Sequence, residues 1–207
     1  MPIADILAEL RAEATECTDL IATAHRTGPD TLALFTQSEQ RRITICAFLN
    51  LFVAWETFTE QSLVSFMIGD SAISGRFPTR FVTPATRESA LAILMGNNRY
   101  FDFANHEHVG KIAGIYFQDG YPFQPHLRSI ATDLADLRMM RNASAHISTS
   151  TQTALESLGQ RILGTPRKNI QLYDLLVAPD PRARGVETVV GTSRDKLLAA
   201  AQLIATG

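Results

Sequence analysis

With 207 residues, of which 45% are hydrophobic and 19% charged, the chain has the composition of an ordinary globular protein and can bury a substantial core. This composition excludes disorder throughout the chain. A formal net charge of −2 and a pI near 6.2 exclude a general attraction to polyanions, so any nucleic-acid contact requires a local basic patch.

The N-terminal quarter of the chain predicts two helices. Apolar residues recur at steps of three and four, which predicts a first helix over residues 4–26, ended by the Gly-Pro-Asp turn at 28–30. Asp5 and Glu9 lie in this amphipathic pattern without a basic start, so we do not expect a signal peptide. A second helical region extends to about Met67, and its longest apolar run is too short to cross a bilayer.

Residues 69–84 contain Gly, Pro, Ser and Thr and predict a loop. The densest basic group before the helix at 124–146 consists of Arg76, Arg80 and Arg87. These arginines are either scattered solvated side chains or a contact for phosphates. A short helix up to Met95 should follow. An aromatic-rich stretch then surrounds a helix over about 107–117, and its rings either stack on bases or fill the space between helices.

The most informative stretch lies in a helix predicted over about 124–146, after the turn at Gly120. Arg138, Asn142 and His146 follow one another at steps of four, which places them in one row on the helix surface, and Arg141 lies beside that row. A guanidinium, an amide and an imidazole on one side of a helix can hold a phosphate and transfer a proton.

The remaining chain predicts further helices over 152–163 and 193–205, with a short one over 169–177. Thr192 or Ser193 should cap the last helix, and residues 187–190 should be extended because they are rich in β-branched side chains. The fold class predicted from these elements is all-α, and we find no internal repeat.

The segment Arg141-Asn142-Ala143-Ser144-Ala145-His146 resembles the Arg-x4-His signature of HEPN domains, including the frequent Asn after the Arg. Its context, an apolar helix bearing Trp55-Glu56 and a helix and Gly turn before the motif, is similar to HEPN domains of the RiboL-PSP type. The resemblance implies one HEPN-like antiparallel helical bundle, with a core over about 40–147 and a helical C-terminal extension over 148–207.

The resemblance implies a metal-independent endoribonuclease in a toxin, stress or defence system, without a cofactor. His146 would act as general base or acid, and Arg141 would hold the phosphate. Asn142 would orient either the phosphate or His146. Arg138, Ser144 and Glu56 are expected to bind substrate or to support the site; Glu56 either contacts an arginine in the cleft or lies on the exposed side. HEPN domains generally pair two motifs around a two-fold axis, which implies a homodimer, RNA as substrate and a possible antitoxin or immunity protein.

Other interpretations of the same residues remain open. His146 could cap the helix, and the arginines could be solvated or paired with Asp133 or Asp136. The domain could be an inactive HEPN sensor or adaptor, or a helical domain whose Arg-His pair only holds an anion. Ser148 occupies the position where many HEPN toxins carry a Tyr that a partner nucleotidyltransferase modifies, which puts that control in doubt but not cleavage.

Metal chemistry has little support in the sequence. His106 and His108 are two apart and would point in different directions on a helix, and no further ligands accompany them at useful spacing. Cys17 and Cys46 are lone cysteines in apolar helical patterns, which indicates core residues in a reducing cytoplasm. We therefore expect no metal, no membrane association and a cytoplasmic location.

Overall fold

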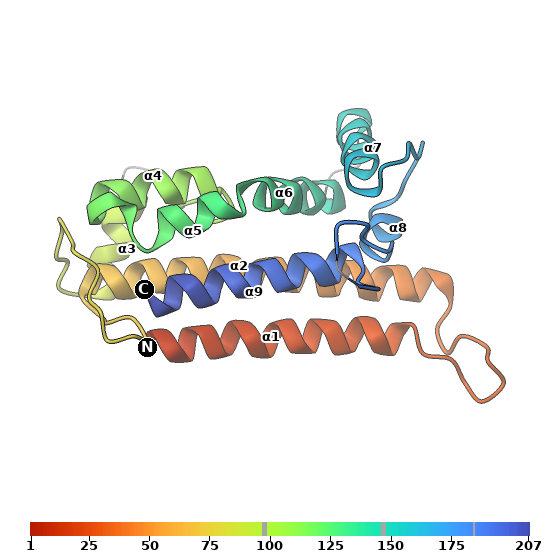
Figure 1. Ribbon diagram of the computed structural model, residues 1–207, viewed down its shortest axis with the longest axis horizontal. Helices are drawn as coiled ribbons and strands as arrows, with labels where there is room; N and C mark the ends of the chain where they lie inside the picture. The colour runs from red at the N-terminus through yellow and green to blue at the C-terminus, as the bar shows by residue number, and fades with distance from the viewer. Residues whose placement is uncertain (97–98, 146–147, 184) are drawn as a thin grey trace. The chain divides into compact units, whose positions relative to one another are not determined.

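The computed structural model describes residues 1–96, 99–145, 148–183 and 185–207 (Figure 1). These residues form α-helices and one 3-10 turn and no β-strand, so the fold is all-α, as the sequence predicts. The elements in chain order are α1 (Ile3–Ala24), α2 (Gln37–Ile68), α3 (Arg87–Met95), α4 (His106–Tyr116), η1 (Gln118–Gly120), α5 (Phe123–Ser129), α6 (Ala131–Ala145), α7 (Thr149–Leu163), α8 (Leu172–Leu176) and α9 (Val189–Thr206).

The chain divides into two compact units. Unit 1 consists of Met1–Arg11, Ala54–Leu134 and Lys196–Gly207, and unit 2 consists of Ala12–Val53 and Ala135–Asp195. The divisions fall inside α1, α2, α6 and α9, so each of these helices contributes residues to both units.

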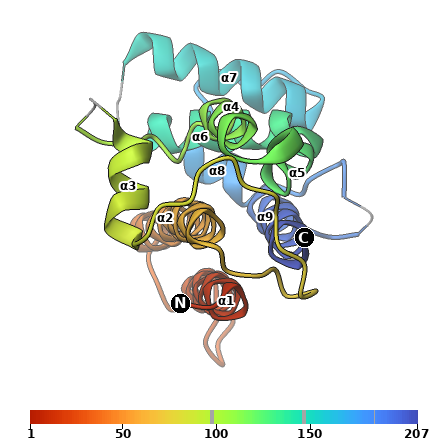
Figure 2. The same ribbon diagram turned by 90° about the vertical axis from the view of Figure 1, so that its left-hand side faces the viewer.

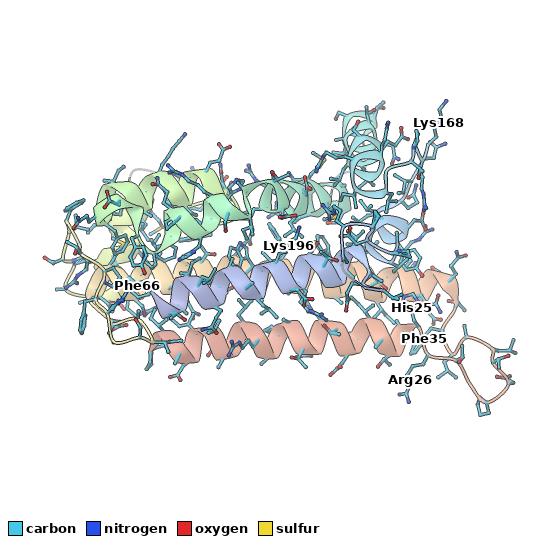
Figure 3. The ribbon with its side chains drawn as sticks, viewed as in Figure 1. His25, Arg26, Phe35, Phe66, Lys168 and Lys196 are labelled. Carbon is cyan, nitrogen blue, oxygen red and sulfur yellow. The ribbon has the colours of Figure 1, made fainter. Side chains whose placement is uncertain are left out.

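In unit 1 the start of α1 lies beside the end of α2 and the end of α9 and runs antiparallel to both (Figures 1 and 2). The Ser65 hydroxyl on α2 donates to the Met1 carbonyl at 3.2 Å. Arg11 on α1 donates to the side-chain oxygen of Gln202 on α9 at 2.5 Å. Phe66 contacts Phe123 of α5 edge to face, with ring centroids 5.9 Å apart (Figure 3). Buried aromatic rings of this kind supply much of the apolar area that holds helices together.

The loop between α2 and α3 is fixed to its surroundings in unit 1. Backbone hydrogen bonds join Phe81 to Tyr116 at 2.8 Å and Gln118 to Thr79 at 3.0 Å. The α3 helix then begins at a capping box formed by Thr86, whose side chain accepts the Ser89 amide. These bonds explain why a segment rich in Gly and Pro still has a defined path.

Unit 2 contains α7, α8 and the adjoining parts of the long helices. His25 at the end of α1 stacks on Tyr173 of α8, with ring centroids 5.9 Å apart and planes 8° from parallel (Figure 3). In the segment before α9, the buried Asp180 carboxylate accepts hydrogen bonds from the backbone and the guanidinium of Arg182 at 2.8–2.9 Å. These bonds hold the pKa of Asp180 below its usual value.

The single helix predicted over 124–146 is wrong, because the chain forms α5 and α6 with Ile130 between them at φ −121° and ψ 23°. The Ser129 hydroxyl donates to the His126 carbonyl at 2.7 Å, and such local bonds compete with helix formation. A β-branched residue at the junction adds to this effect. The α6 helix carries Arg141 and Asn142, whereas His146 lies outside the described residues.

The start of the last helix also differs from the prediction, since α9 begins at Val189 and includes both residues proposed as its cap. The Thr188 side chain instead accepts the Gly191 amide at 3.2 Å. Val189 and Val190 are 0% and 6% exposed, so burial in the helix outweighs their preference for extended structure. The extended structure predicted here is limited to one isolated bridge between Pro179 and Thr188.

Helix α2 is the longest helix in the described part of the chain. It has 32 residues, and an 18-residue window reaches a mean hydropathy of 1.2, enough to cross a membrane by length and composition alone. In the structure 44% of that window is buried, and the core helix of a helical bundle meets the same criterion of length and composition.

Candidate functional site at the end of helix α6

Arg141 lies in the last two turns of α6 with an exposed side chain. Its Nη1 donates to the Oδ1 atom of the neighbouring Asn142 at 3.2 Å. Within the described ranges, no carboxylate forms an ion pair with this guanidinium. Arg141 is therefore a cation that is partly fixed by an amide and open to an anion from solvent.

The two carboxylates predicted as possible partners of Arg141 each pair with another cation. The Asp136 carboxylate is buried on α6 and forms an ion pair with Arg161 of α7 in unit 2. In unit 1 the Asp133 carboxylate pairs with Lys196 of α9 at 2.7 Å (Figure 3). The alternative in which Arg141 is a structural partner of Asp136 is therefore wrong.

Ser144 and Asn142 support Arg141 through the helix. The Ser144 hydroxyl donates to the Arg141 carbonyl at 2.5 Å, which satisfies a backbone acceptor near the end of α6. Asn142 is half-buried, and so is Arg138 one turn before it, as expected of residues four apart on one helix face. Because His146 is not among the described residues, its predicted place in this row stays a prediction.

Glu56 belongs to unit 1, whereas Arg141 and Arg138 belong to unit 2. Glu56 is half-buried and directly follows Trp55, which is 2% exposed. The expectation that Glu56 contacts one of these arginines stays a prediction.

The basic group predicted in the loop before α3 is not a row of free cations. Arg80 donates to the Met67 carbonyl at 2.9 Å and Arg87 donates to the Ser65 hydroxyl at 3.1 Å. These two guanidinium groups hold the loop against the end of α2, and Arg76 alone is exposed. Two of the three arginines predicted as a possible phosphate contact therefore donate to groups within the fold instead.

The aromatic stretch before α5 is mainly internal packing. Phe101 is 8% exposed and contacts Phe103 and His108, with ring centroids 4.6 and 4.5 Å apart. This arrangement favours the interpretation of these rings as filler between helices, although Tyr100 is 74% exposed. In the described part of the chain no three His, Cys, Asp or Glu side chains cluster so that they could hold a metal ion.

A cavity of about 320 Å³ in unit 2 adjoins the end of α6 and was not predicted from the sequence. Ala143 and Ser144 line it on one side, and Arg41 of α2 and Tyr173 of α8 line it on others. Arg41 precedes a long apolar run and belongs to no motif in the sequence. Its position in the cavity lining could be found only once α2 and α8 were placed side by side.

The structure defines an all-α protein with an exposed arginine beside a half-buried asparagine at a helix end, and a cavity with polar and apolar walls next to them. No protein-family model, curated protein or solved structure matches this chain.

Proposed function

We propose that the protein is a metal-independent endoribonuclease of the HEPN type. The observation that carries this proposal is the exposed Arg141, which Asn142 fixes and no described carboxylate neutralises, five residues before His146. A purely structural arginine would be expected to donate to another element of the fold, as Arg161 does to Asp136 and Arg80 does to the Met67 carbonyl.

RNA carries its own nucleophile, so the protein has to move protons and stabilise charge. The 2′-oxygen loses its proton to a base and attacks the adjacent phosphorus, while the bond from phosphorus to the 5′-oxygen breaks. Arg141 would hold the non-bridging oxygens as negative charge develops on them, and Asn142 would keep its guanidinium in place. His146 would accept or donate the proton, since an imidazole titrates near neutral pH. The products are a 2′,3′-cyclic phosphate and a 5′-hydroxyl end.

One chain supplies one motif, whereas in-line cleavage benefits from a base on one side of the phosphate and an acid on the other. On an ideal helix the directions of residues 141 and 146 differ by about 140°, which suits a groove between two helices better than a pocket on one. A homodimer with a composite site is therefore part of the proposal. An antitoxin or immunity protein in the cytoplasm would be the partner that controls it.

The test is cleavage of single-stranded RNA by the full chain in EDTA, with mass spectrometry of the product ends. We expect cyclic phosphate ends, and we expect Arg141→Ala and His146→Ala to abolish them while circular dichroism stays unchanged. Arg128→Ala is the matched control, because Arg128 is also an exposed helix arginine, and it should cleave like the unaltered chain. Absence of cleavage, together with a bound partner protein that survives both substitutions, would instead indicate an adaptor.

A further inference from the structure

The cavity beside the end of α6 has the chemistry of an anion site. Residues from α2, α6, α7 and α8 and from the segments that precede α7 and α8 line it, all within unit 2, and its volume is about 320 Å³. This volume is at the lower end of the range for pockets that bind small molecules. Among the residues that the structure describes, its lining includes the cation Arg41 but neither Asp nor Glu.

Arg41 has one buried donor without an acceptor. Its Nε atom is buried and has no hydrogen-bond partner, and no described carboxylate pairs with its guanidinium. Its guanidinium lies over the Tyr173 ring, whose centroid is 5.9 Å from the Arg41 Cζ atom. A buried donor without an acceptor costs stability unless a ligand or water satisfies it, so this guanidinium is set up to receive an anion.

The other walls of the cavity explain which anion fits. Ser148 places a hydroxyl group there, and Gln171 adds an amide whose nitrogen also donates to the Asn169 carbonyl at 3.2 Å. The Ser144 and Thr151 hydroxyls line the cavity too, but they donate to the Arg141 and Ser148 carbonyls. Several polar groups around one guanidinium match the several oxygens of a phosphate group. Ile45, Leu155 and Leu172 give the cavity an apolar part that can contact the remainder of a ligand.

We propose that this cavity binds the phosphate group of a small phosphate monoester, with Arg41 as the residue that neutralises it. A nucleic-acid strand is the less suitable occupant, because strand binding depends on several cations along a backbone, and the described residues of the lining include a single one. This inference does not rest on the proposed nuclease activity, since it uses neither Arg141 nor His146.

The experiment is calorimetric titration of the full chain with inorganic phosphate, ribose 5-phosphate and ribose. We expect both phosphates to bind and ribose to give no heat. Arg41→Gln should weaken ribose 5-phosphate binding at least about tenfold, because it removes the charge that faces the anion. Arg42→Gln is the matched control, since Arg42 is the next residue of α2 and is exposed. The affinity of this variant for ribose 5-phosphate should stay unchanged.

Arg41→Lys keeps the charge and loses the planar fork, so it should weaken binding even if Arg41→Gln fails to fold. Loss of ribose 5-phosphate binding in Arg41→Gln, with RNA cleavage unchanged in the same variant, would separate this inference from the nuclease proposal. Failure of both phosphates to bind, or equal affinity in the Arg41 variants, would overturn the inference. Binding of single-stranded RNA through Arg41, without binding of either small phosphate, would also overturn it.

Discussion

Replacing Arg161 with Met removes the ion-pair partner of a buried carboxylate on the helix that carries Arg141. The Asp136 side chain is 7% exposed, and its Oδ2 atom already has no hydrogen-bond partner among the described residues. Arg161→Met would leave the other oxygen without its partner too, so that a negative charge would remain in an apolar environment.

The magnitude follows from the exposure of the two side chains. Exposed ion pairs contribute about 0–1 kcal/mol, whereas removal of one partner from a fully buried pair costs about 3–5 kcal/mol. The Arg161 side chain is 48% exposed, which places this pair between the two limits. We expect Arg161→Met to lower the free energy of unfolding by about 2 kcal/mol, or the midpoint of thermal unfolding by about 4–8 °C.

Urea unfolding followed by circular dichroism measures this loss. The double variant Asp136→Asn/Arg161→Met should be more stable than Arg161→Met alone, because a neutral amide costs less to bury than an unpaired charge. Lys168→Met, at an exposed cation without an ion pair in the described part of the chain, should change stability by less than about 0.5 kcal/mol. Equal stability of Arg161→Met and the unaltered chain, or strictly additive effects in the double variant, would refute the reasoning.

Three further predictions concern pH, thiol reactivity and a turn. Asp180→Asn should lower the free energy of unfolding by about 1–3 kcal/mol at neutral pH, measured by urea unfolding. Because the pKa of Asp180 is lowered in the folded chain, the difference in stability between the variant and the unaltered chain should shrink as pH falls below about 4. Iodoacetamide at pH 8 should label the exposed Cys46 but not Cys17, whose pKa burial raises to about 11, until the chain is denatured; labelling of both in the native chain would be inconsistent with this. Gly120→Ala should lower the free energy of unfolding by about 1–2 kcal/mol, because Gly120 has φ +66° and an added Cβ would lie 2.7 Å from the Cβ atom of Gln124. Gly114→Ala is the control and should not destabilise the chain, since its added Cβ would lie at an ordinary contact distance of 3.5 Å from the Gln124 side chain.

The helical elements could be predicted because they depend on short-range patterns. The step of three and four along α1 predicts its type, and the Gly-Pro-Asp turn at 28–30 predicts an end at about residue 26, close to the observed end at Ala24. The Gly and Pro content after α2 predicts the loop. The break at Ile130 and the start of α9 at Val189 could not be predicted in this way. They depend on a local hydroxyl bond and on the burial of two valines, which sequence spacing does not report.

The candidate site was predictable in its chain position but not in its partners. Spacing places Arg141 and Asn142 next to each other near a helix end, and the structure adds the 3.2 Å bond between them. The partner of Asp136 could not be predicted, because Arg161 comes from another helix 25 residues later. Arg41 was missed for the same reason, since its cavity is formed by elements from four parts of the chain.

The central claim is that Arg141 and His146 cleave RNA without a metal. Its most direct measurement is the chemical form of the 3′ ends after incubation of RNA with the full chain in EDTA. We expect 2′,3′-cyclic phosphate ends that are lost in both Arg141→Ala and His146→Ala and kept in Arg128→Ala. RNA that stays intact with the unaltered chain, or cyclic ends that persist in a folded His146→Ala variant, would contradict the claim.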